Sequence, residues 1–438
     1  MDSGGWRLER SASTSCERYW KGDVSIESLM EEILSRENVI RAYRAVKRND
    51  GAPGVDGIDT RAMAAHLRQH WPTIRDKLYA GSYEAALVLG VQIPKPNGGV
   101  RQLGIPTVQD RLIQQAVQQV LSREFEPTFS DGSFGYRPGR RAHDAVRRAQ
   151  QYVMEGKRWV VDLDISAFFD EVNHDILMTR VGRHVRDKRV LKLIGRYLRA
   201  GLKQDGRVQK RSQGTPQGGP LSPLLANLYL DALDKELEQR QLSFVRYADD
   251  VAIYVSSERS AERVLASITP WIERHLRLRV NREKSGAGPT GQRKLLGFLI
   301  QPDGRIEIAP ESVQGYRATV REVWNVRNGR SGPDTVKTWQ VYLRGWWNYF
   351  AMAQSWWSDL SAWTRRHMRK WFWQRWHNRA GRLNWLRRLG LAGHQLSRVN
   401  CHLAAWPAAR QPGMHQALSN RCLRRWGLLT PNDLATVP

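Results

Sequence analysis

The sequence of 438 residues contains only three cysteines, Cys16, Cys401 and Cys422, and none of them belongs to a CxxC motif. Disulfide-stapled folds and cysteine-rich zinc modules need closely spaced cysteines, so both classes are excluded. No apolar run approaches the length of a membrane-spanning helix, and the N-terminus (MDSGGWRLER) lacks the apolar core of a signal peptide. These absences predict a protein of the reducing cytoplasm with no membrane partner.

Acidic residues are scarce relative to basic ones. The chain has 69 Lys and Arg against 43 Asp and Glu, a formal net charge of +26 and a pI of about 10.5. Such an imbalance indicates a polyanionic partner, most often nucleic acid, because clustered cations release counterions from phosphates. A hydrophobic fraction of 41% still permits a globular core, and the length allows two or three domains.

The positive charge and the tryptophans gather toward the C-terminus. Residues 311–438 carry 20 Lys or Arg against 5 Asp or Glu, and 13 of the 18 tryptophans. Because this change in composition follows QPDGR, we expect a domain boundary near residues 305–311. The chain shows no internal repeat and no low-complexity tract.

Hydrophobic periodicity predicts mixed strands and helices up to residue 300 and mainly helices after it. The fold class is therefore α+β, a catalytic body followed by a helical basic C-terminal appendage. Helices are expected at 27–48, 60–79, 108–124, 140–155, 174–200, after the turn GTPQGG and at 258–276. Strands are expected at 87–93, 100–105, 159–165, 244–255 (two strands about a tight turn) and 294–300, with a further pair in GLKQDGRVQKRS.

Two adjacent carboxylates, Asp249 and Asp250, lie in the apolar segment FVRYADDVAIYV. Burying neighbouring like charges is costly unless a cation lies between them, and a divalent metal is the obvious candidate. In WVVDLDI, Asp162 and Asp164 alternate onto one face of a predicted strand. Carboxylates from two distant strands suit a two-Mg²⁺ phosphoryl-transfer site. The alternative for YADD alone is a solvated turn.

The chain contains a series of motifs that resembles one enzyme family. In order they are IPKPNGGVRQLGIPTVQDRLIQQAV, FSDGSFGYRPGRRAHDAV, VVDLDISAFFDEVNHDIL, GTPQGGPLSPLLANLYLDALDKEL, FVRYADDVAIYV, LRVNREKSG and KLLGF. These are similar to the successive blocks of group II intron reverse transcriptases, also called maturases. RNDGAPGVDGID resembles the N-terminal extension of that family, and YLRGWWNYF its thumb-like maturase domain. The resemblance covers roughly residues 30–375 and is strongest to the compact class IIC branch.

The resemblance implies a right-hand polymerase of fingers, palm and thumb. It places an N-terminal extension at 1–85, fingers and palm at 86–305 with the palm at about 159–185 and 214–305, the thumb or maturase domain at 306–375, and a basic DNA-binding region at 376–438. Beyond about residue 376 the match is looser. Many members carry an endonuclease module with paired CxxC motifs. The present sequence has no such motif, so we do not expect second-strand cleavage by this chain.

The resemblance assigns the metal site residue by residue. Asp164 and Asp249 match the metal-binding catalytic acids, assisted by the backbone carbonyl of Ile165, and Asp250 matches the third catalytic carboxylate. Two Mg²⁺ ions are expected, with Mn²⁺ as an alternative. The rival acids are Asp162, interpreted as structural, and Asp170, interpreted as a charged residue that opens the next helix.

The nucleotide pocket is assigned in the same way. Phe169 matches the ring under the sugar of the incoming nucleotide, where it selects dNTP over rNTP, and Phe168 is the alternative core phenylalanine. Gln217 matches a residue that lines the pocket. Gly218 and Gly219, assigned to the primer and template, let the backbone approach closely.

Cations complete the predicted pocket. Arg101 and Arg111 match residues near the triphosphate, since guanidinium groups suit phosphate oxygens, and each could instead form an ordinary salt bridge. Lys284 matches a lysine that reaches the leaving pyrophosphate. Tyr247 is expected near the primer end, although a packing tyrosine would look the same.

The basic residues outside this pocket are expected to bind RNA or DNA. In SAWTRRHMRKWFWQRW, one helical face is predicted to pack inward and the other to present cations to phosphates. Most tryptophans, including Trp346 and Trp347, are expected in the core. The predicted RNA- and DNA-binding residues are Arg137, Arg140, Arg365, Arg366, Arg369 and Arg375.

The function implied by the resemblance is RNA-directed DNA polymerisation in a bacterial cytoplasm. The enzyme would bind its group II intron RNA, assist splicing as a maturase, and copy the intron into DNA during retrohoming. The expected partners are the intron RNA, an RNA template with a DNA primer, target DNA and dNTPs, and homodimerisation stays open. Two alternatives also stay open: a maturase that only assists splicing, and a host-recruited reverse transcriptase for DNA repair or phage defence.

Overall fold

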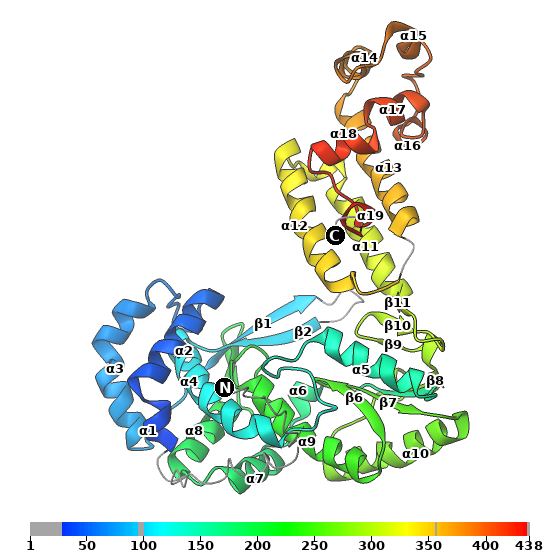
Figure 1. Ribbon diagram of the computed structural model, residues 1–438. Helices are drawn as coiled ribbons and strands as arrows, with labels where there is room; N and C mark the ends of the chain where they lie inside the picture. The colour runs from blue at the N-terminus through cyan, green and yellow to red at the C-terminus, as the bar shows by residue number, and fades with distance from the viewer. Residues whose placement is uncertain (1–28, 95–99, 355–356, 436–438) are drawn as a thin grey trace, which may run out of the picture. The chain divides into compact units, whose positions relative to one another are not determined.

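The computed structural model describes residues 29–94, 100–354 and 357–435 (Figure 1). The chain forms two compact units that interleave in sequence. The first holds the chain up to 131 with 165–236 and 269–280, and the second holds 132–164, 237–268 and the chain from 281 onward. The chain passes between them inside helices α9 (Ser222–Gln239) and α10 (Glu258–His275). Each compact unit therefore joins segments that the predicted domain boundaries assign to different domains.

The first unit starts with a layer of helices. The predicted helix at 27–48 is divided, because the Ser35 side chain accepts a hydrogen bond from the Asn38 backbone N–H and caps a new helix start. The buried Asn38 amide then donates to the Ala116 carbonyl and joins two helices of the layer. The layer consists of α1 (Leu29–Ile33), α2 (Arg36–Asn49), α3 (Met63–Tyr79) and α4 (Val108–Phe125).

A four-stranded sheet and a second group of helices complete the first unit. The sheet has the order β2-β1-β4-β5, with β1 parallel to β4 and the other pairs antiparallel. The predicted helix at 174–200 is two helices, because Asp187 accepts from the Arg189 backbone N–H and caps the second. The elements are β1 (Val88–Pro94), β2 (Val100–Ile105), α6 (Phe168–Glu171), α7 (His174–His184), α8 (Lys188–Arg199), β4 (Leu202–Gln204) and β5 (Arg207–Gln209).

The second unit contains an antiparallel sheet of order β6-β7-β3-β8. Helix α5 (Ala142–Met154) packs against β6 and β7. Strand β8 (Gly286–Pro289) was not predicted, because GAGP has no β-branched residue and little β propensity. Its glycines leave room for the Arg293 side chain, which a Cβ on Gly286 would meet at 2.3 Å. The other strands are β3 (Trp159–Leu163), β6 (Ser243–Tyr247) and β7 (Asp250–Val255).

A smaller sheet of order β11-β10-β9 precedes the C-terminal helices. The single strand predicted at 294–300 is two short strands, β9 (Lys294–Leu295) and β10 (Phe298–Ile300). They are separated by a turn in which Leu296 and Gly297 have φ of 51° and 83°. β11 (Ile306–Ile308) pairs antiparallel with β10.

Several tryptophans form the core of the C-terminal helices. Trp346 lies there as predicted, whereas Trp347, which was also expected in the core, is only half-buried. Trp324, Trp339 and Trp373 are fully buried, and the Trp339 indole N–H donates to the Leu429 carbonyl. The long helices α11 (Pro310–Val323), α12 (Gly332–Phe350) and α13 (Trp357–Arg375) lie side by side (Figure 1). The short helices after them are α14 (Arg379–Arg388), α15 (Gly393–Leu396), α16 (Ala405–Ala408), α17 (Pro412–Ala417), α18 (Asn420–Arg425) and α19 (Pro431–Ala435).

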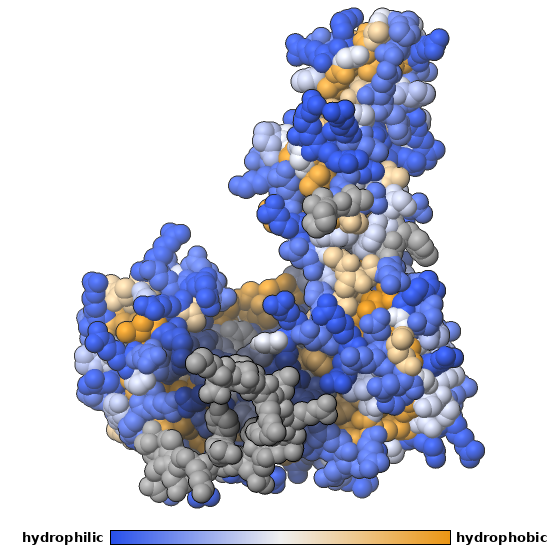
Figure 2. Space-filling view, in the orientation of Figure 1, coloured by the Kyte–Doolittle hydropathy of each residue, from blue (hydrophilic) through white to orange (hydrophobic). Residues whose placement is uncertain are grey.

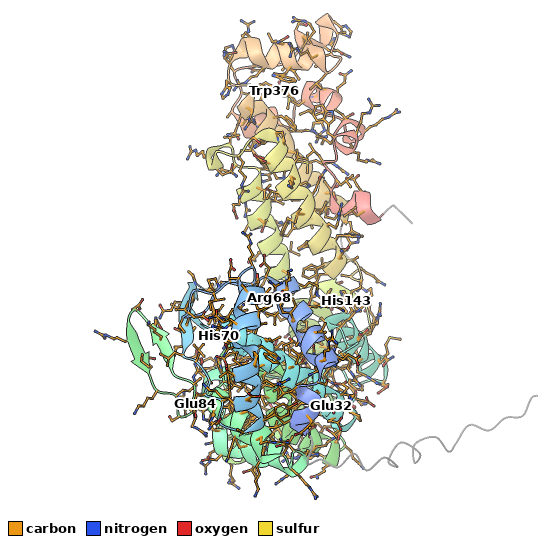
Figure 3. The ribbon with its side chains drawn as sticks, turned by 90° about the vertical axis from the view of Figure 1, so that its left-hand side faces the viewer. Glu32, Arg68, His70, Glu84, His143 and Trp376 are labelled. Atoms are coloured by element: carbon orange, nitrogen blue, oxygen red, sulfur yellow. The ribbon has the colours of Figure 1, made fainter. Side chains whose placement is uncertain are left out.

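A histidine on α5 ties this helix to α12 within the second unit. The His143 ring, labelled in Figure 3, has its Nε2 2.7 Å from the Tyr349 carbonyl oxygen. Its ring also contacts Phe298 of β10 edge-on, with centroids 6.5 Å apart. Among the described residues, no helix is long and apolar enough to cross a membrane.

Candidate active site

The register of β3 and β7 brings the predicted acids to one end of the sheet. Leu163 pairs with Val251, so Asp164 follows β3 at the end where Asp250 begins β7. Tyr247 pairs with Asp250, which leaves Ala248 and Asp249 as a two-residue hairpin turn. Ala248 has φ of 58°, a left-handed conformation that a residue with a Cβ adopts at some cost. The predicted convergence of the acids is confirmed, whereas their catalytic role stays a prediction.

Burial and neighbouring carboxylates raise the pKa of two acids at this end of the sheet, Asp250 and Asp162. The pKa of Asp250 is raised to about 6, first by the surrounding protein, which displaces water, and then by the charges of Asp249, Asp162 and Asp164. The pKa of Asp162 is also raised to about 6 by burial, with Asp164 adding to the rise and Arg293 opposing it. The end of the sheet is therefore a site of incompletely balanced negative charge.

This donor set suits a divalent cation by its chemistry. Carboxylate oxygens are the ligands that Mg²⁺ prefers, and a bound cation would offset both the burial and the repulsion that raise the pKa values of Asp250 and Asp162. Within the described part of the chain, however, no three His, Cys, Asp or Glu side chains gather closely enough to form a metal-ligand cluster. That Asp164, Asp249 and Asp250 hold such an ion therefore stays a prediction.

A polar loop anchors Asp164 and brings a lysine beside it. The Asp164 backbone N–H donates to Ser285 Oγ at 2.9 Å, and its carbonyl accepts from the Asn281 backbone N–H at 2.8 Å. The Asn281 side chain accepts from the Lys284 backbone N–H and shapes the loop. Lys284 Nζ lies 4.0 Å from Asp164 Oδ2, with 69% of its side chain exposed. This cation is available to an incoming anion.

Arg246, which precedes the YADD turn, is a supporting residue that the sequence did not reveal. It is fully buried and donates to the Ala248 carbonyl at 3.0 Å and to Ser133 Oγ at 2.8 Å. A Cβ on Gly135 would lie 2.2 Å from the Ala248 backbone nitrogen, so this glycine must lack a side chain. Arg246 therefore positions the turn. A single arginine in a strand gives no sequence signal for such a role.

The same segment corrects a prediction about nucleic-acid binding. Arg137, expected to bind RNA or DNA, is buried and donates to the Ser133 carbonyl at 2.9 Å. Arg140 is half-buried, with its guanidinium 5.5 Å from the centroid of the Phe134 ring. For Arg137 the RNA-binding prediction is wrong, because its side chain serves the loop beside the YADD turn.

In the first unit, hydrogen bonds hold the segments that carry two of the predicted nucleotide residues, Phe169 and Gln217. Phe168 is 2% exposed and fills the core, whereas Phe169 is half-buried, as expected if the two rings have different roles. The Phe169 carbonyl accepts from the Thr215 backbone N–H at 2.7 Å, and the Gln217 carbonyl accepts from Gly104 at 2.8 Å. The loop that carries Gln217 is thus tied to α6 and to β2.

Glycines in this loop permit close approach to the protein itself. Gly218 has φ of 132°, and a Cβ there would lie 2.6 Å from the Gly104 carbonyl oxygen. A Cβ on Gly219 would lie 2.5 Å from Gln114 Oε1 on α4. The close approach that the structure shows is to β2 and α4 of the protein itself. Contact of these glycines with primer or template stays a prediction.

The two arginines predicted near the triphosphate have different environments. Arg101 on β2 is exposed and stays a candidate. Arg111 on α4 is buried, donates to the Ala52 carbonyl at 2.8 Å and has its pKa lowered by burial. A Cβ on Gly51 would meet its guanidinium at 2.7 Å. Arg111 therefore holds the N-terminal loop, and its prediction as a triphosphate ligand is wrong.

Two of the four arginines predicted to face phosphates on α13 are buried. Arg365 lies 2.7 Å from Asp433 Oδ1 of α19, and Arg369 donates to the Leu418 carbonyl. For both, the prediction is wrong, because partners far along the chain cover that face. Arg366 is half-buried against Trp406 and Arg375 is exposed, so these two stay candidates. Hydrophilic side chains cover much of the visible face of the C-terminal helices (Figure 2).

Two family models match the chain. The model for reverse transcriptase (RNA-dependent DNA polymerase) matches residues 93–300, which include all four carboxylates of the sheet end. The model for the group II intron, maturase-specific domain, matches residues 313–390. Together they place a polymerase domain before the composition change and a maturase domain after it.

The chain is similar to several known proteins. Protein YkfC of Escherichia coli (strain K12) is 32% identical over 302 residues, which cover 60% of this chain and 79% of YkfC. The group II intron-encoded protein LtrA of Lactococcus lactis subsp. cremoris is 35% identical over 240 residues, 55% of this chain but only 39% of LtrA. A solved telomerase structure from Candida albicans shows 12% identity and a TM-score of 0.45, covering 82% of this chain and 67% of that one. The chain belongs to the group II intron-type reverse transcriptases that carry a maturase domain.

Proposed function

We propose that this chain is an RNA-directed DNA polymerase that binds its own group II intron RNA, assists its splicing and copies it into DNA during retrohoming. The observation that carries the proposal is the meeting of Asp164 with the YADD acids at one end of an antiparallel sheet. It occurs in a chain with both a polymerase and a maturase domain. The intron RNA, an RNA template with a DNA primer, target DNA and dNTPs are the proposed partners.

In the proposed reaction, the primer 3′-oxygen forms a bond to the α-phosphorus of a dNTP as the bond to pyrophosphate breaks. When bound, two divalent ions, Mg²⁺ or Mn²⁺, would supply electrostatic stabilisation of the attacking and leaving oxygens. Asp164, Asp249, Asp250 and the Ile165 carbonyl are the proposed ligands. Lys284, already 4.0 Å from Asp164, is placed to attract the leaving pyrophosphate.

The remaining residues of the proposed site orient the reactants. The half-buried Phe169 ring excludes a 2′-hydroxyl, and Gln217 lines the pocket from the loop bound to β2. Arg101 is proposed as the exposed cation for the triphosphate. Arg246 acts through the YADD turn, whose carbonyl it binds, and is a positioning residue.

Primer extension on an RNA template tests the polymerase proposal. Asp249→Ala should abolish extension, because it removes a carboxylate from the turn that faces Asp164. Asp303→Asn is a matched control, since Asp303 is an exposed acid paired with Arg305 outside the sheet end. Extension by Asp249→Ala at the wild-type rate would overturn the proposal.

Sequencing of the RNA that co-purifies from the native cells tests the intron proposal. A single enriched RNA that ends at intron boundaries and contains the flanks of this gene would support a maturase bound to its intron. Diverse RNA, together with active primer extension, would instead support a host-recruited reverse transcriptase. Bound intron RNA without primer extension would support a maturase that only assists splicing.

A further inference from the structure

An open groove of about 430 Å³ lies among the C-terminal helices of the second unit. It is formed by the start of α12, the end of α13 and the segment that follows α18. We name it the tryptophan groove, and its lining residues are Gly332, Pro333, Val336, Lys337, Gln340, Trp371, Phe372, Trp426 and Leu428. Its volume falls in the range of small-ligand sites.

The surface of the groove is aromatic. Trp371 is 3% exposed and Phe372 is half-buried, with their ring centroids 5.0 Å apart. Trp426 is 39% exposed and packs one side of its ring near Phe372, with centroids 5.5 Å apart. Burial of an exposed aromatic ring at a concave site is favourable, and a flat apolar group covers such a ring best. The ligand that suits this surface is therefore planar.

One wall of the groove is held in a fixed position. Gly427 has φ of 73°, and a Cβ there would lie 2.3 Å from the Gln340 amide nitrogen. That amide donates to the Gly427 carbonyl at 3.2 Å and joins α12 to the backbone that carries Trp426. A polar amide thus lies beside the aromatic surface, where the edge of a planar ligand would meet it.

Cations flank the aromatic surface. Lys337 lines the groove and is exposed, and the Arg375 guanidinium lies 4.8 Å from the centroid of the Trp371 ring. Arg375 also donates to the Arg330 carbonyl at 3.2 Å, which fixes it at this edge. The nearby acids are already occupied, since Asp334 accepts from Ser331 at the start of α12 and Glu322 lies 4.0 Å from Arg330.

The positive charge around the groove indicates which kind of partner can bind there. A second copy of this chain would bring its own strongly basic helices against Lys337 and Arg375, because residues 311–438 carry 20 Lys or Arg against 5 acids. A neutral apolar peptide would bring no anion to either cation. A nucleobase joined to phosphates supplies a planar ring for Trp426 and anions for the two cations.

We propose that the tryptophan groove captures one unstacked base of a single-stranded nucleic acid, with the neighbouring phosphates on Lys337 and Arg375. The inference rests on the proposed function in that nucleic acid is the partner. It adds a preference for an unpaired segment and names the place where its base is held. An intron RNA and a DNA strand share this chemistry, and the experiment distinguishes them.

Binding of labelled single-stranded RNA and DNA oligonucleotides, measured by fluorescence anisotropy, tests the proposal. Trp426→Ala should raise Kd about tenfold for a base-bearing strand, because base–aromatic stacking is lost. The same variant should bind an abasic strand of equal length as the wild type does. Trp426→Phe should retain most of the affinity. An effect on RNA alone or on DNA alone supports the groove and identifies the strand it takes.

Trp385 supplies a matched control, since it is an exposed tryptophan (43%) on α14 that does not line the groove. Trp385→Ala should leave the difference between base-bearing and abasic strands unchanged. Photo-crosslinking of 4-thiouridine RNA to the wild-type protein is a second measurement that needs no variant. The crosslinked peptide should contain Trp426 or Phe372.

Two results would overturn the proposal. One is an equal Kd of Trp426→Ala and wild type on base-bearing strands, with crosslinks mapped elsewhere. The other is a change in oligomeric mass of Trp426→Ala, by sedimentation, without a change in Kd, which would assign the groove to a second copy. Both leave primer extension intact, whereas failure of the proposed function would show as loss of extension or of RNA binding by the wild type itself.

Discussion

Two charged clusters of the second unit are balanced in opposite ways. At the end of the sheet, Asp250 lies among other carboxylates, and its pKa is raised to about 6 partly by their charges. Among the C-terminal helices, Asp433 accepts a salt bridge from buried Arg365 at 2.7 Å and another from Arg424 at 3.0 Å. The first cluster keeps its repulsion, and the second neutralises its charge inside the protein.

This difference in charge balance distinguishes residues that can bind a ligand from residues that only stabilise the fold. The repulsion that remains after nearby lysines and arginines have offset part of it is relieved further by a cation or a substrate that binds. A buried ion pair is already satisfied and has nothing to offer a ligand. Residue type alone does not make this distinction, since Arg365 and Arg375 share one basic helix and only Arg375 is exposed.

The largest expected effect is at the sheet end. Asp164→Asn should lower the rate of primer extension at least about 100-fold, because a neutral amide cannot replace the carboxylate in the proposed reaction. The backbone bonds of Asp164 to Ser285 and Asn281 remain, so the fold should persist. Primer extension and a thermal melt together measure both. A lower melting temperature in step with lost activity would contradict the assignment of Asp164 to a site under repulsion.

For the buried Arg365–Asp433 pair we expect a loss of stability instead of a loss of activity. Arg365→Met should destabilise the contact of α13 with α19 by about 2–4 kcal/mol, because Asp433 loses its nearest buried cation. Hydrogen exchange of the α19 amides measures the local loss. Arg366→Met is the control, since Arg366 is half-buried against Trp406 and has no such partner among the described contacts. Equal exchange in the two variants would break the comparison.

Removal of the buried charge of Asp162 should stabilise the protein. The folded pKa of Asp162 is raised to about 6 from an ordinary value near 4, so ionisation is less favourable in the folded state. Ionisation of Asp162 therefore costs the folded state nothing below about pH 4, and it lowers the free energy of unfolding as the pH rises toward 6. Asp162→Asn should gain about 1–2 kcal/mol above pH 6 and gain nothing near pH 4.

Urea unfolding with a chelator present measures this gain at both pH values. Asp303→Asn provides a control acid that forms an exposed ion pair instead of a cluster of like charges. A gain of the same size at low pH would show that the effect of Asp162→Asn is packing and not charge.

The smallest expected effect concerns RNA binding by α13. Arg375→Gln should reduce the slope of log K against log salt by about 0.7–0.9, the value for loss of one phosphate contact. Arg369→Gln should leave the slope unchanged, because buried Arg369 donates to the Leu418 carbonyl and the Asn420 side chain. Filter binding over a range of salt concentrations measures both slopes. A fall in slope for Arg369→Gln would place that side chain on the RNA.

The sequence predicted the parts of the fold that have local signals. The alternation of WVVDLDI and the turn in FVRYADDVAIYV were sufficient to place three strands and to bring their acids together. Phe168 in the core and Phe169 half-exposed also follow from adjacent positions on a short helix. Here the deciding contacts lie within a few residues or within one strand pair.

The errors arise where the deciding partner is remote in sequence. Arg365 is buried because Asp433 lies 68 positions later, and Arg111 because the Ala52 carbonyl lies 59 positions earlier. Strand β8 escaped prediction because pairing with β3, and not its own composition, makes GAGP a strand. Helix periodicity at 174–200 could not show that the Asp187 side chain would begin a second helix.

The central strand β3 has both of its partners downstream, and this sets an order of events during synthesis. Leu163 can pair with Val251, and Asp162 with Gly286, only after these later residues have been synthesised. At a ribosomal rate of roughly 5–20 residues per second, Asp164 spends several seconds on the nascent chain without the strands that align it. Translation that stops before β8 therefore yields a product in which Asp164, Asp249 and Asp250 are all present but β3 lacks one of its two neighbouring strands.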